Sequence, residues 1–369
     1  MNDCLPGLSF VEDKKVHYDQ IKELIKISAR SNHHTNFGPV SLLLEMELCK
    51  INGIEPDSGD WGAVCGSSAT TLISGAVAAL NNRLGRRLRW VASDFGFFTN
   101  FTGPMENAHH VSCDDRGMLD LDALTDQALD SYDAILVTNV FGACDDFDAY
   151  FEFAAKNDKI LMIDNAAGFG ALTPKYCNAH SAPMPDTWLE IISLHHTKPW
   201  GMGEGGAVFA RDDLIHYIRA SINFGVSPTV KCADLRWCLN GKMSELAAAA
   251  ILSHVSRHET WVGQYLNQTR RVFDIGIQAG LKPLFGELPK EHVVGQIAFQ
   301  SPYPVSFDQL GGINIPLQKY YRPTLQSGSK SQALYRDMVN VPCHPGMETL
   351  SDDMIYDALV AVSELGMQS

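Results

Sequence analysis

The sequence lacks three features that would each assign a protein class: an excess of basic residues, a long apolar run and an ordered cysteine pattern. Its formal net charge is -14. Nucleic acids and anionic membranes bind basic surfaces, so neither is expected as the main partner. No apolar run approaches the roughly 18 residues of a membrane span, and residues 1–15 lack the basic and apolar regions of a secretory signal. We therefore expect a cytoplasmic protein.

The cysteines also exclude a class of site. There are nine of them, an odd number, and they are scattered along the chain. Disulfide frameworks and zinc sites need paired spacings. The close pair Cys232 and Cys238 is too isolated to form such a site. Reduced thiols and no bound metal are the prediction.

The chain nevertheless has the composition of a folded protein with a large core. It has 369 residues, of which 45% are hydrophobic and 20% charged, which predicts one larger and one smaller domain. Helical patterns at about 16–30 and 40–51 come first. Between residues 65 and 210, short β-prone runs then alternate with helical patterns. These runs are LRWVAS, HHVSC, AILVTNV, KILMID, EIISL and GGAVFA. Strands interleaved with helices predict a mostly parallel sheet with helices on both faces, an α/β fold.

The pattern changes after residue 240. A long helical stretch, residues 242–280, leads into a mixed tail whose last helix begins at about Ser351. We therefore predict a large domain over residues 1–240, and a long helix with a small α+β domain over residues 241–369.

A possible anion site lies at residues 65–70, CGSSAT, where a glycine and two serines precede an alanine-rich helical pattern. The free N–H groups and the dipole of a helix N-terminus favour a phosphate there. Taken alone, the stretch is better explained by an N-cap at Ser67. It is not a P-loop, because no Gly-Lys-Ser/Thr follows.

Asp164 directly follows the apolar strand pattern KILMI. It is therefore expected at the carboxyl end of a buried strand, where a carboxylate needs a cationic partner to offset desolvation. A loop carboxylate that caps Ala166 and Ala167 fits the pattern equally well.

Lys198 lies in SLHHTKPWGMGEGGAVFA, residues 193–210, between two β-prone runs. It is expected on a connection between strands, where burial would lower the pKa of its amine and make it a nucleophile. A phosphate cradle, a carboxylate after one strand and a lysine after a later one, in this order, form the arrangement that a pyridoxal phosphate (PLP) enzyme needs.

Here the sequence resembles a known family, the DegT-like sugar aminotransferases of fold type I. It is most similar to the branch that forms dTDP-4-amino-4,6-dideoxyglucose and related amino sugars. The stretches that carry the resemblance, in family order, are TNFGPVSLLLEMEL (35–48), GSSAT (66–70), NVFGACDDFDAYFEFA (139–154), MIDNAAGFGAL (162–172), SLHHTKPWGMGEGGAVF (193–209), INFG (222–225), LNGKMSELAAA (239–249), KYYRP (319–323) and VNVPCHPGM (339–347).

The resemblance implies a fold type I PLP-transferase fold and roles for individual residues. Lys198 would be the Schiff-base lysine and catalytic base, and Asp164 the partner of the pyridine nitrogen. The cofactor-binding positions that it implies are Ser67, Ser68 and Ser193 for the phosphate, Phe97 for stacking on the ring, and Asn240 for the phosphate of the neighbouring subunit's cofactor. Phe95 or Phe98 could take the place of Phe97, because SDFGFFTN departs from the usual pattern. A homodimer with shared active sites is implied.

Two further points concern the substrate side. Many members carry Gln or His three residues after the aspartate, where this chain has Ala167. His195, His196 and Tyr321 are candidate substrate contacts, while packing or surface roles for them are as well supported.

The resemblance thus implies transamination of a keto-sugar nucleotide, for example a dTDP-4-keto-6-deoxyhexose, with L-glutamate as the expected donor. Its product would enter lipopolysaccharide, O-antigen or glycoside biosynthesis. The alternatives are a non-nucleotide keto sugar, sugar acid or cyclitol as substrate, or a PLP-binding regulatory protein without turnover. A deoxygenating dehydratase of the same fold is disfavoured, because that branch has histidine where this chain has Lys198.

Overall fold

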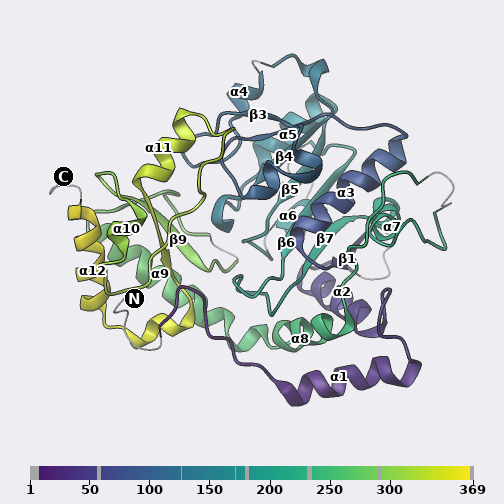
Figure 1. Ribbon diagram of the computed structural model, residues 1–369, viewed down its shortest axis with the longest axis horizontal. Helices are drawn as coiled ribbons and strands as arrows, with labels where there is room; N and C mark the ends of the chain where they lie inside the picture. The colour runs from purple at the N-terminus through teal and green to yellow at the C-terminus, as the bar shows by residue number, and fades with distance from the viewer. Residues whose placement is uncertain are drawn as a thin grey trace.

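The computed structural model describes residues 8–55, 60–125, 127–170, 172–178, 183–230, 235–289 and 292–365. Within these ranges the strands form a sheet of seven and a sheet of three. Figure 1 shows the two sheets in separate parts of the molecule, with α8 leading from the larger part towards the smaller one.

The larger sheet has the strand order β1-β7-β6-β5-β4-β2-β3. Neighbouring strands are parallel except at β7, which runs antiparallel to both β1 and β6. The strands are β1 (Trp61–Gly66), β2 (Trp90–Ser93), β3 (His109–Val111), β4 (Ala134–Thr138), β5 (Ile160–Asp164), β6 (Trp188–Ser193) and β7 (Gly206–Arg211). The predicted mostly parallel sheet is confirmed, and β1 is an additional strand that the hydrophobic pattern did not predict.

Helices cover both faces of this sheet, which explains why its central strands are almost continuously apolar. One face packs on α3 and α7, through side chains such as Leu72 and Ile218. The other packs on α5 through Phe151 and, nearer β1 and β7, on α2 and α8. The helices of this part are α1 (Tyr18–Ser31), α2 (Pro39–Ile51), α3 (Ala69–Leu84), α4 (Leu121–Thr125), α5 (Asp148–Lys156), α6 (Leu172–Asn178), α7 (Asp212–Ser221) and α8 (Glu245–Val255).

The smaller sheet is antiparallel, with the order β10-β9-β8. Its strands are β8 (Lys282–Pro283), β9 (Gln296–Gln300) and β10 (Met338–Pro342), and its helices are α9 (Val262–Gln278), α10 (Phe307–Leu310), α11 (Ser329–Asp337) and α12 (Asp352–Glu364). Ser351 is the N-cap of α12 and accepts a hydrogen bond from the Met354 N–H at 3.2 Å. The predicted start of the last helix is confirmed.

The predicted single helix over residues 242–280 is wrong, because the structure divides it into α8 and α9. Between them the chain turns at residues 256–261. Trp261 folds back on α8, where its ring stacks on His254 at 4.9 Å and its Nε1 donates to the His254 carbonyl at 3.4 Å. This ring contact is tertiary, so helical periodicity does not reveal it. The domain boundary at residues 240–241 stays a prediction.

None of the helices in the described ranges is long and apolar enough to cross a membrane.

Candidate active site

The ends of four strands bring the predicted site segments to one edge of the larger sheet. In the strand register, Gly206 at the start of β7 lies between Gly66 of β1 and Ser193 of β6. Asp164 ends β5 and pairs with Ile191 of β6. Because β1, β5 and β6 are parallel, their carboxyl ends meet at the same edge, which is where α/β sheets gather their ligands.

The segment after β1 forms a cradle of backbone amides at the start of α3. Ser68, rather than Ser67, is the N-cap, and its Oγ accepts from the Thr71 N–H at 3.1 Å. The Ser67 hydroxyl donates to Thr71 Oγ1 at 3.2 Å, and the Ser67 N–H donates to the Gly241 carbonyl at 2.8 Å. The first N–H groups of a helix have no partner within it, so this end of α3 can bind an anion.

Gly206 keeps this cradle open. A Cβ on Gly206 would lie 2.6 Å from the Ala69 nitrogen and 2.9 Å from the Ser68 carbonyl carbon. Any larger residue would therefore fill the space beside the first amides of α3. With Ser193 opposite Gly206, the described residues fit a phosphate group at this place.

Asp164 is buried, with 3% of its surface exposed. Its Oδ1 accepts from the Ala166 N–H at 3.2 Å, so the capping role considered for it is also present. Burial raises the pKa of Asp164 to about 6, while the Ala166 hydrogen bond and the charge of Lys198 act in the opposite direction. The carboxylate therefore interacts with the lysine that the sequence singled out.

Lys198 lies on the loop of residues 194–205 that connects β6 with β7, as expected for a connection between strands. Burial lowers the pKa of its amine, and the charge of Asp164 raises it. The Leu194 N–H donates to Gly205 O at 2.9 Å, and the His196 N–H donates to Gly203 O at 2.8 Å.

Gly201 lets this loop close, because a Cβ there would collide with the His195 carbonyl oxygen. The glycines of this segment thus serve close backbone packing around Lys198.

Three phenylalanine rings gather around Tyr321. Tyr321 stacks on Phe141 with the ring centroids 5.0 Å apart, and its ring meets those of Phe95 at 5.6 Å and Phe97 at 6.3 Å. Burial and the charge of Asp164 raise the pKa of the Tyr321 phenol. Tyr321 therefore lies close enough to Asp164 for their charges to interact.

The structure separates the three phenylalanines that were considered for ring stacking. Phe95 is 2% exposed and belongs to the core, whereas Phe97 and Phe98 are 49% and 52% exposed. Phe98 contacts Phe97, with ring centroids 5.6 Å apart. Phe97 is thus an exposed ring that also contacts Tyr321, and its stacking role stays a prediction. Phe141 was not predicted as part of the site, although it lies in NVFG, within one of the stretches that carry the family resemblance.

The two histidines before Lys198 have other polar partners. His195 Nδ1 lies 2.8 Å from Thr197 Oγ1, and His195 Nε2 lies 3.4 Å from a carboxylate oxygen of Glu204. Burial, and then the charge of Lys14, lower the pKa of His196. His195 thus pairs along its own loop, and Lys14 binds the His196 backbone carbonyl and acts on its ring through charge. The substrate roles of both histidines stay predictions.

Asn240 is exposed and lies next to the cradle of its own chain. The carbonyl of its neighbour Gly241 accepts from the Ser67 N–H at 2.8 Å. The Asn240 Oδ1 accepts from Lys242 Nζ at 2.6 Å. The Lys242 ammonium also lies 4.2 Å from the Phe224 ring centroid. The implied contact of Asn240 with a neighbouring subunit stays a prediction.

A buried polar network behind Asp164 was not predicted. Asn165 donates to Glu190 Oε1 at 2.6 Å and to the Gly168 carbonyl, and Asn139 donates to Asn165 Oδ1 at 2.8 Å. The Thr173 hydroxyl donates to the second oxygen of Glu190. Burial raises the pKa of Glu190 to about 7. This network fixes the backbone directly after Asp164. In the sequence, the one indication of this network is Glu190, a single charged residue in the apolar strand pattern EIISL.

Replacement of Glu190 by glutamine is expected to change how stability depends on pH. Because the pKa of Glu190 is about 7 when folded and 4.5 when exposed, the folded state holds a proton that the unfolded state loses. The stability from this group is therefore full below pH 4.5 and is lost as pH rises through 7, by up to about 3 kcal/mol. Denaturant unfolding at pH 5 to 8 should show a smaller loss in Glu190→Gln. Equal losses in wild type and variant would contradict the assignment, and Glu204→Gln is the exposed control.

Two further predictions concern metal-binding residues and the cysteine pair. No cluster of three or more His, Cys, Asp or Glu among the described residues could hold a metal ion. Cys232 lies outside the described residues, and Cys238 is exposed.

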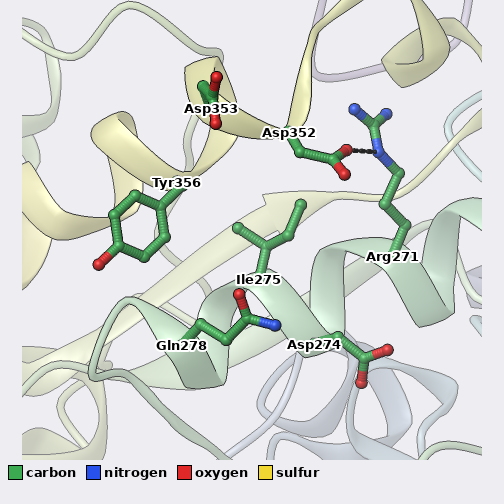
Figure 2. Close-up of a pocket in the computed structure, with 7 residues that line it drawn as sticks. All are labelled: Arg271, Asp274, Ile275, Gln278, Asp352, Asp353 and Tyr356. Carbon is green, nitrogen blue, oxygen red and sulfur yellow. Dashed lines mark hydrogen bonds and ion pairs between the residues drawn. The ribbon is translucent and has the colours of Figure 1, made fainter.

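A groove of about 350 Å³ lies between α9 and α12, and Figure 2 shows its lining. Arg271 is the basic residue of this groove, and its guanidinium binds Asp352 at 2.6 Å and the Leu350 carbonyl at 2.6 Å. Its donors serve the packing of α9 against α12, so the groove is no rival to the edge that holds Asp164 and Lys198.

Comparison with known proteins gives several curated relatives, of which two illustrate the range. Protein Rv3402c of Mycobacterium tuberculosis is 35% identical over 129 residues, which is 34% of this chain and 30% of that protein. The UDP-2-acetamido-2-deoxy-3-oxo-D-glucuronate aminotransferase of Pseudomonas aeruginosa is 25% identical over 249 residues, 61% of this chain and 65% of that protein. The chain thus matches about a third of the first relative's length and less than two thirds of the second's.

The fold is similar to that of solved aminotransferase structures. Helicobacter pylori PseC, an aminotransferase involved in the biosynthesis of pseudoaminic acid, superposes with a TM-score of 0.72 at 16% identity, over 98% of this chain and all of that one. The predicted fold type I PLP-transferase architecture is confirmed. Residues 18–278 match the family described as DegT/DnrJ/EryC1/StrS aminotransferases. The chain therefore belongs to the DegT/DnrJ/EryC1/StrS aminotransferase family, whose members depend on PLP.

Proposed function

We propose that this chain is a PLP-dependent aminotransferase that converts a keto-sugar nucleotide into an amino sugar, with L-glutamate as the expected donor. The observation that carries the proposal is that Asp164 and the amide cradle lie at one edge of the sheet, with Lys198 on the loop after β6 and close enough to Asp164 for their charges to interact. Each of the three parts is weak evidence alone, and together they provide the groups that PLP chemistry needs.

The described residues fit the cofactor. The N–H groups at the start of α3, with Ser67, Ser68 and Ser193, would hold the phosphate. Asp164 would pair with the pyridine nitrogen, Lys198 would carry the cofactor through its amine, and Phe97 would lie against the ring. When bound, PLP supplies an electron sink for the carbanion formed when a proton leaves the substrate.

Lys198 must lose its proton to react, whereas Asp164 must keep its negative charge. Burial favours the uncharged form of both groups, so it helps Lys198 and opposes Asp164. By lowering the pKa of Lys198, burial increases the fraction of free amine that can act as nucleophile and base. The same burial raises the pKa of Asp164 to about 6, still below neutral pH. Asp164 is therefore mainly a carboxylate at pH 7, and a cation placed beside it would favour the carboxylate further.

The substrate class rests on the family and on one relative. The Pseudomonas aeruginosa relative is an aminotransferase of a UDP-linked 3-oxo sugar. This supports a nucleotide-linked keto sugar here, and we place the dTDP-4-keto-6-deoxyhexoses within the class to be tested. A non-nucleotide keto sugar, sugar acid or cyclitol is the second candidate, and a PLP-binding regulatory protein the third.

We further propose a homodimer in which Asn240 contacts the neighbouring subunit's phosphate. It is supported by the exposure of Asn240 and of the adjacent Phe224, which is a large apolar side chain on the surface. α2 and α8 pack against each other and also expose apolar side chains. These are Leu42, Leu43, Met46 and Leu246. Exposed apolar surface of this kind is typical of subunit interfaces.

The absorption spectrum of the purified protein tests the proposal. Protein supplied with PLP should show the visible band of lysine-bound PLP, and L-glutamate should convert it to the spectrum of the aminated cofactor. The dTDP- and UDP-linked keto sugars are then added one at a time. The sugar that is the substrate should restore the visible band of lysine-bound PLP. Non-nucleotide keto sugars and cyclitols form the comparison set.

Each outcome of this experiment has a distinct meaning. The absence of a PLP band would contradict the proposal entirely. A band that no amino donor changes would favour the regulatory alternative, and restoration by a non-nucleotide substrate alone would replace the nucleotide sugar.

A further inference from the structure

An N-terminal strap, defined here as residues 8–17, links the small domain to the loop that carries Lys198. Leu8 packs against the core of the smaller sheet, and the Ser9 carbonyl accepts from His344 Nε2 at 2.9 Å. Glu12 accepts from the hydroxyl of Tyr265 on α9 at 2.8 Å. In Figure 1 the purple N-terminal segment leaves the small domain and runs to α1, which packs on α8.

Lys14 is the strap residue that reaches the loop of residues 194–205. It is 6% exposed, and its ammonium donates to the carbonyl oxygens of His196 and Gly201, both at 2.7 Å, and to that of Lys198. An ammonium has three donors, and each is used on this loop. Burial lowers the pKa of Lys14 to about 8, and the charge of Glu12 raises it.

A second basic side chain holds the same stretch of backbone from α8. His254 Nε2 donates to the Pro199 carbonyl at 2.8 Å, and burial lowers the pKa of His254 to about 4, so the ring is neutral. Lys14 and His254 together bind the carbonyls of residues 196, 198, 199 and 201 from outside the loop. The backbone of Lys198 is therefore fixed on both sides of the residue.

We propose that Lys14 is a positioning residue, which holds the Lys198 loop so that the Lys198 amine faces Asp164 and the cofactor. This inference rests on the proposed function. The three carbonyls that Lys14 binds belong to Lys198 itself and to residues two before and three after it. An apolar side chain of similar length would fill the space but remove the Lys14 donor from all three carbonyls. The Lys198 carbonyl would keep the Gly201 N–H as a donor at 3.0 Å, whereas the His196 and Gly201 carbonyls would lose the donor that holds them, which destabilises that local conformation.

The placement also connects two parts of the molecule that are far apart in sequence. Lys14 is 184 residues from Lys198, and the strap is bound to the small domain at Leu8, Ser9 and Glu12. A movement of the small domain relative to the sheet would therefore act on the Lys198 loop through the strap.

Hydrogen–deuterium exchange of the protein without added PLP tests the inference independently of any activity. In Lys14→Met, amides in residues 194–203 should exchange at least about tenfold faster than in wild type, because their hydrogen bonds within the loop open more often. Strand β4 should exchange at the wild-type rate. Lys15→Met is the matched control, since Lys15 is the adjacent exposed lysine, and it should change neither segment.

A kinetic measurement separates positioning from a purely structural role. In the half-reaction with L-glutamate, the maximal rate in Lys14→Met should fall about tenfold or more, because the amine is misplaced. The glutamate concentration that gives half the maximal rate should stay within about threefold of wild type, because Lys14 lies behind the loop. Should glutamate produce no spectral change even in wild type, the proposed function fails while the exchange result still decides whether Lys14 holds the loop.

The outcomes that would overturn the inference are specific. Exchange in residues 194–203 that matches Lys15→Met would show that Lys14 does not hold the loop. Faster exchange with an unchanged maximal rate would remove its role in positioning Lys198. If Lys14→Met does not fold, Tyr265→Phe removes the hydrogen bond to Glu12 and should still speed exchange in the same loop. An unchanged loop in that variant would equally contradict the inference.

Discussion

Replacing Lys198 by alanine is expected to lower transamination by at least about 10⁴-fold, because one side chain supplies both the nucleophile and the proton-transfer group. The protein should still fold. Lys198 is a desolvated amine whose pKa is lowered by burial, and its removal takes away a group that burial penalises. Single-turnover absorbance with L-glutamate gives the rate, and circular dichroism with thermal unfolding gives the folded state.

Two variants sharpen this test. Lys50→Ala changes an exposed lysine at the end of α2 and should keep the wild-type rate. Lys198→Arg retains a cation but not a nucleophile, because guanidinium does not lose its proton near neutral pH, so it should be as inactive as the alanine variant. Turnover of Lys198→Ala at the wild-type rate would show that the central assignment is wrong.

The sequence predicted the parts of the site that lie directly beside strands. Asp164 follows the buried run ILMI, and Lys198 lies between two apolar runs. A strand pattern determines where such a residue lies, because parallel strands end at a common edge. The amino-acid pattern thus located both reactive groups, and the strand order then brought them together.

The sequence could not predict contacts between distant segments. Lys14 reads as one of two adjacent lysines in a charged stretch, and only the fold shows that it is buried against the Lys198 loop. Phe141 adopts a positive φ of 58° beside Tyr321, 180 residues further along the chain. Neither periodicity nor composition contains information on such pairs.

The local sequence around Asp94 also does not show that this residue links two distant segments. The stretch SDFGFFTN departs from the usual family pattern, and in the structure its Asp94 accepts from Ser331 Oγ at 2.6 Å and from the Gly328 N–H at 2.8 Å. These bonds tie the loop that carries Phe97 to the start of α11 in the small domain. Asp94 therefore has a structural role that the sequence alone does not indicate.

Replacing Asp164 by asparagine is expected to lower the rate by about 10²- to 10³-fold, the usual cost of losing one electrostatic partner of the transition state. Asparagine has nearly the same shape and can still accept from the Ala166 N–H. It lacks the negative charge that would stabilise a protonated pyridine nitrogen. The variant should therefore bind PLP through Lys198 and show its visible band, but L-glutamate should convert that band slowly.

The same substitution also removes the charge that raises the pKa of Lys198. The amine of Asp164→Asn should then be deprotonated at lower pH than in wild type, so a shortage of free amine cannot explain a slow reaction. Asp146→Asn, at an exposed carboxylate, is the matched control and should react at the wild-type rate. A near-normal rate for Asp164→Asn would remove Asp164 from its proposed role at the ring nitrogen. A slow rate with an intact band would place the defect in the proton transfer rather than in cofactor binding.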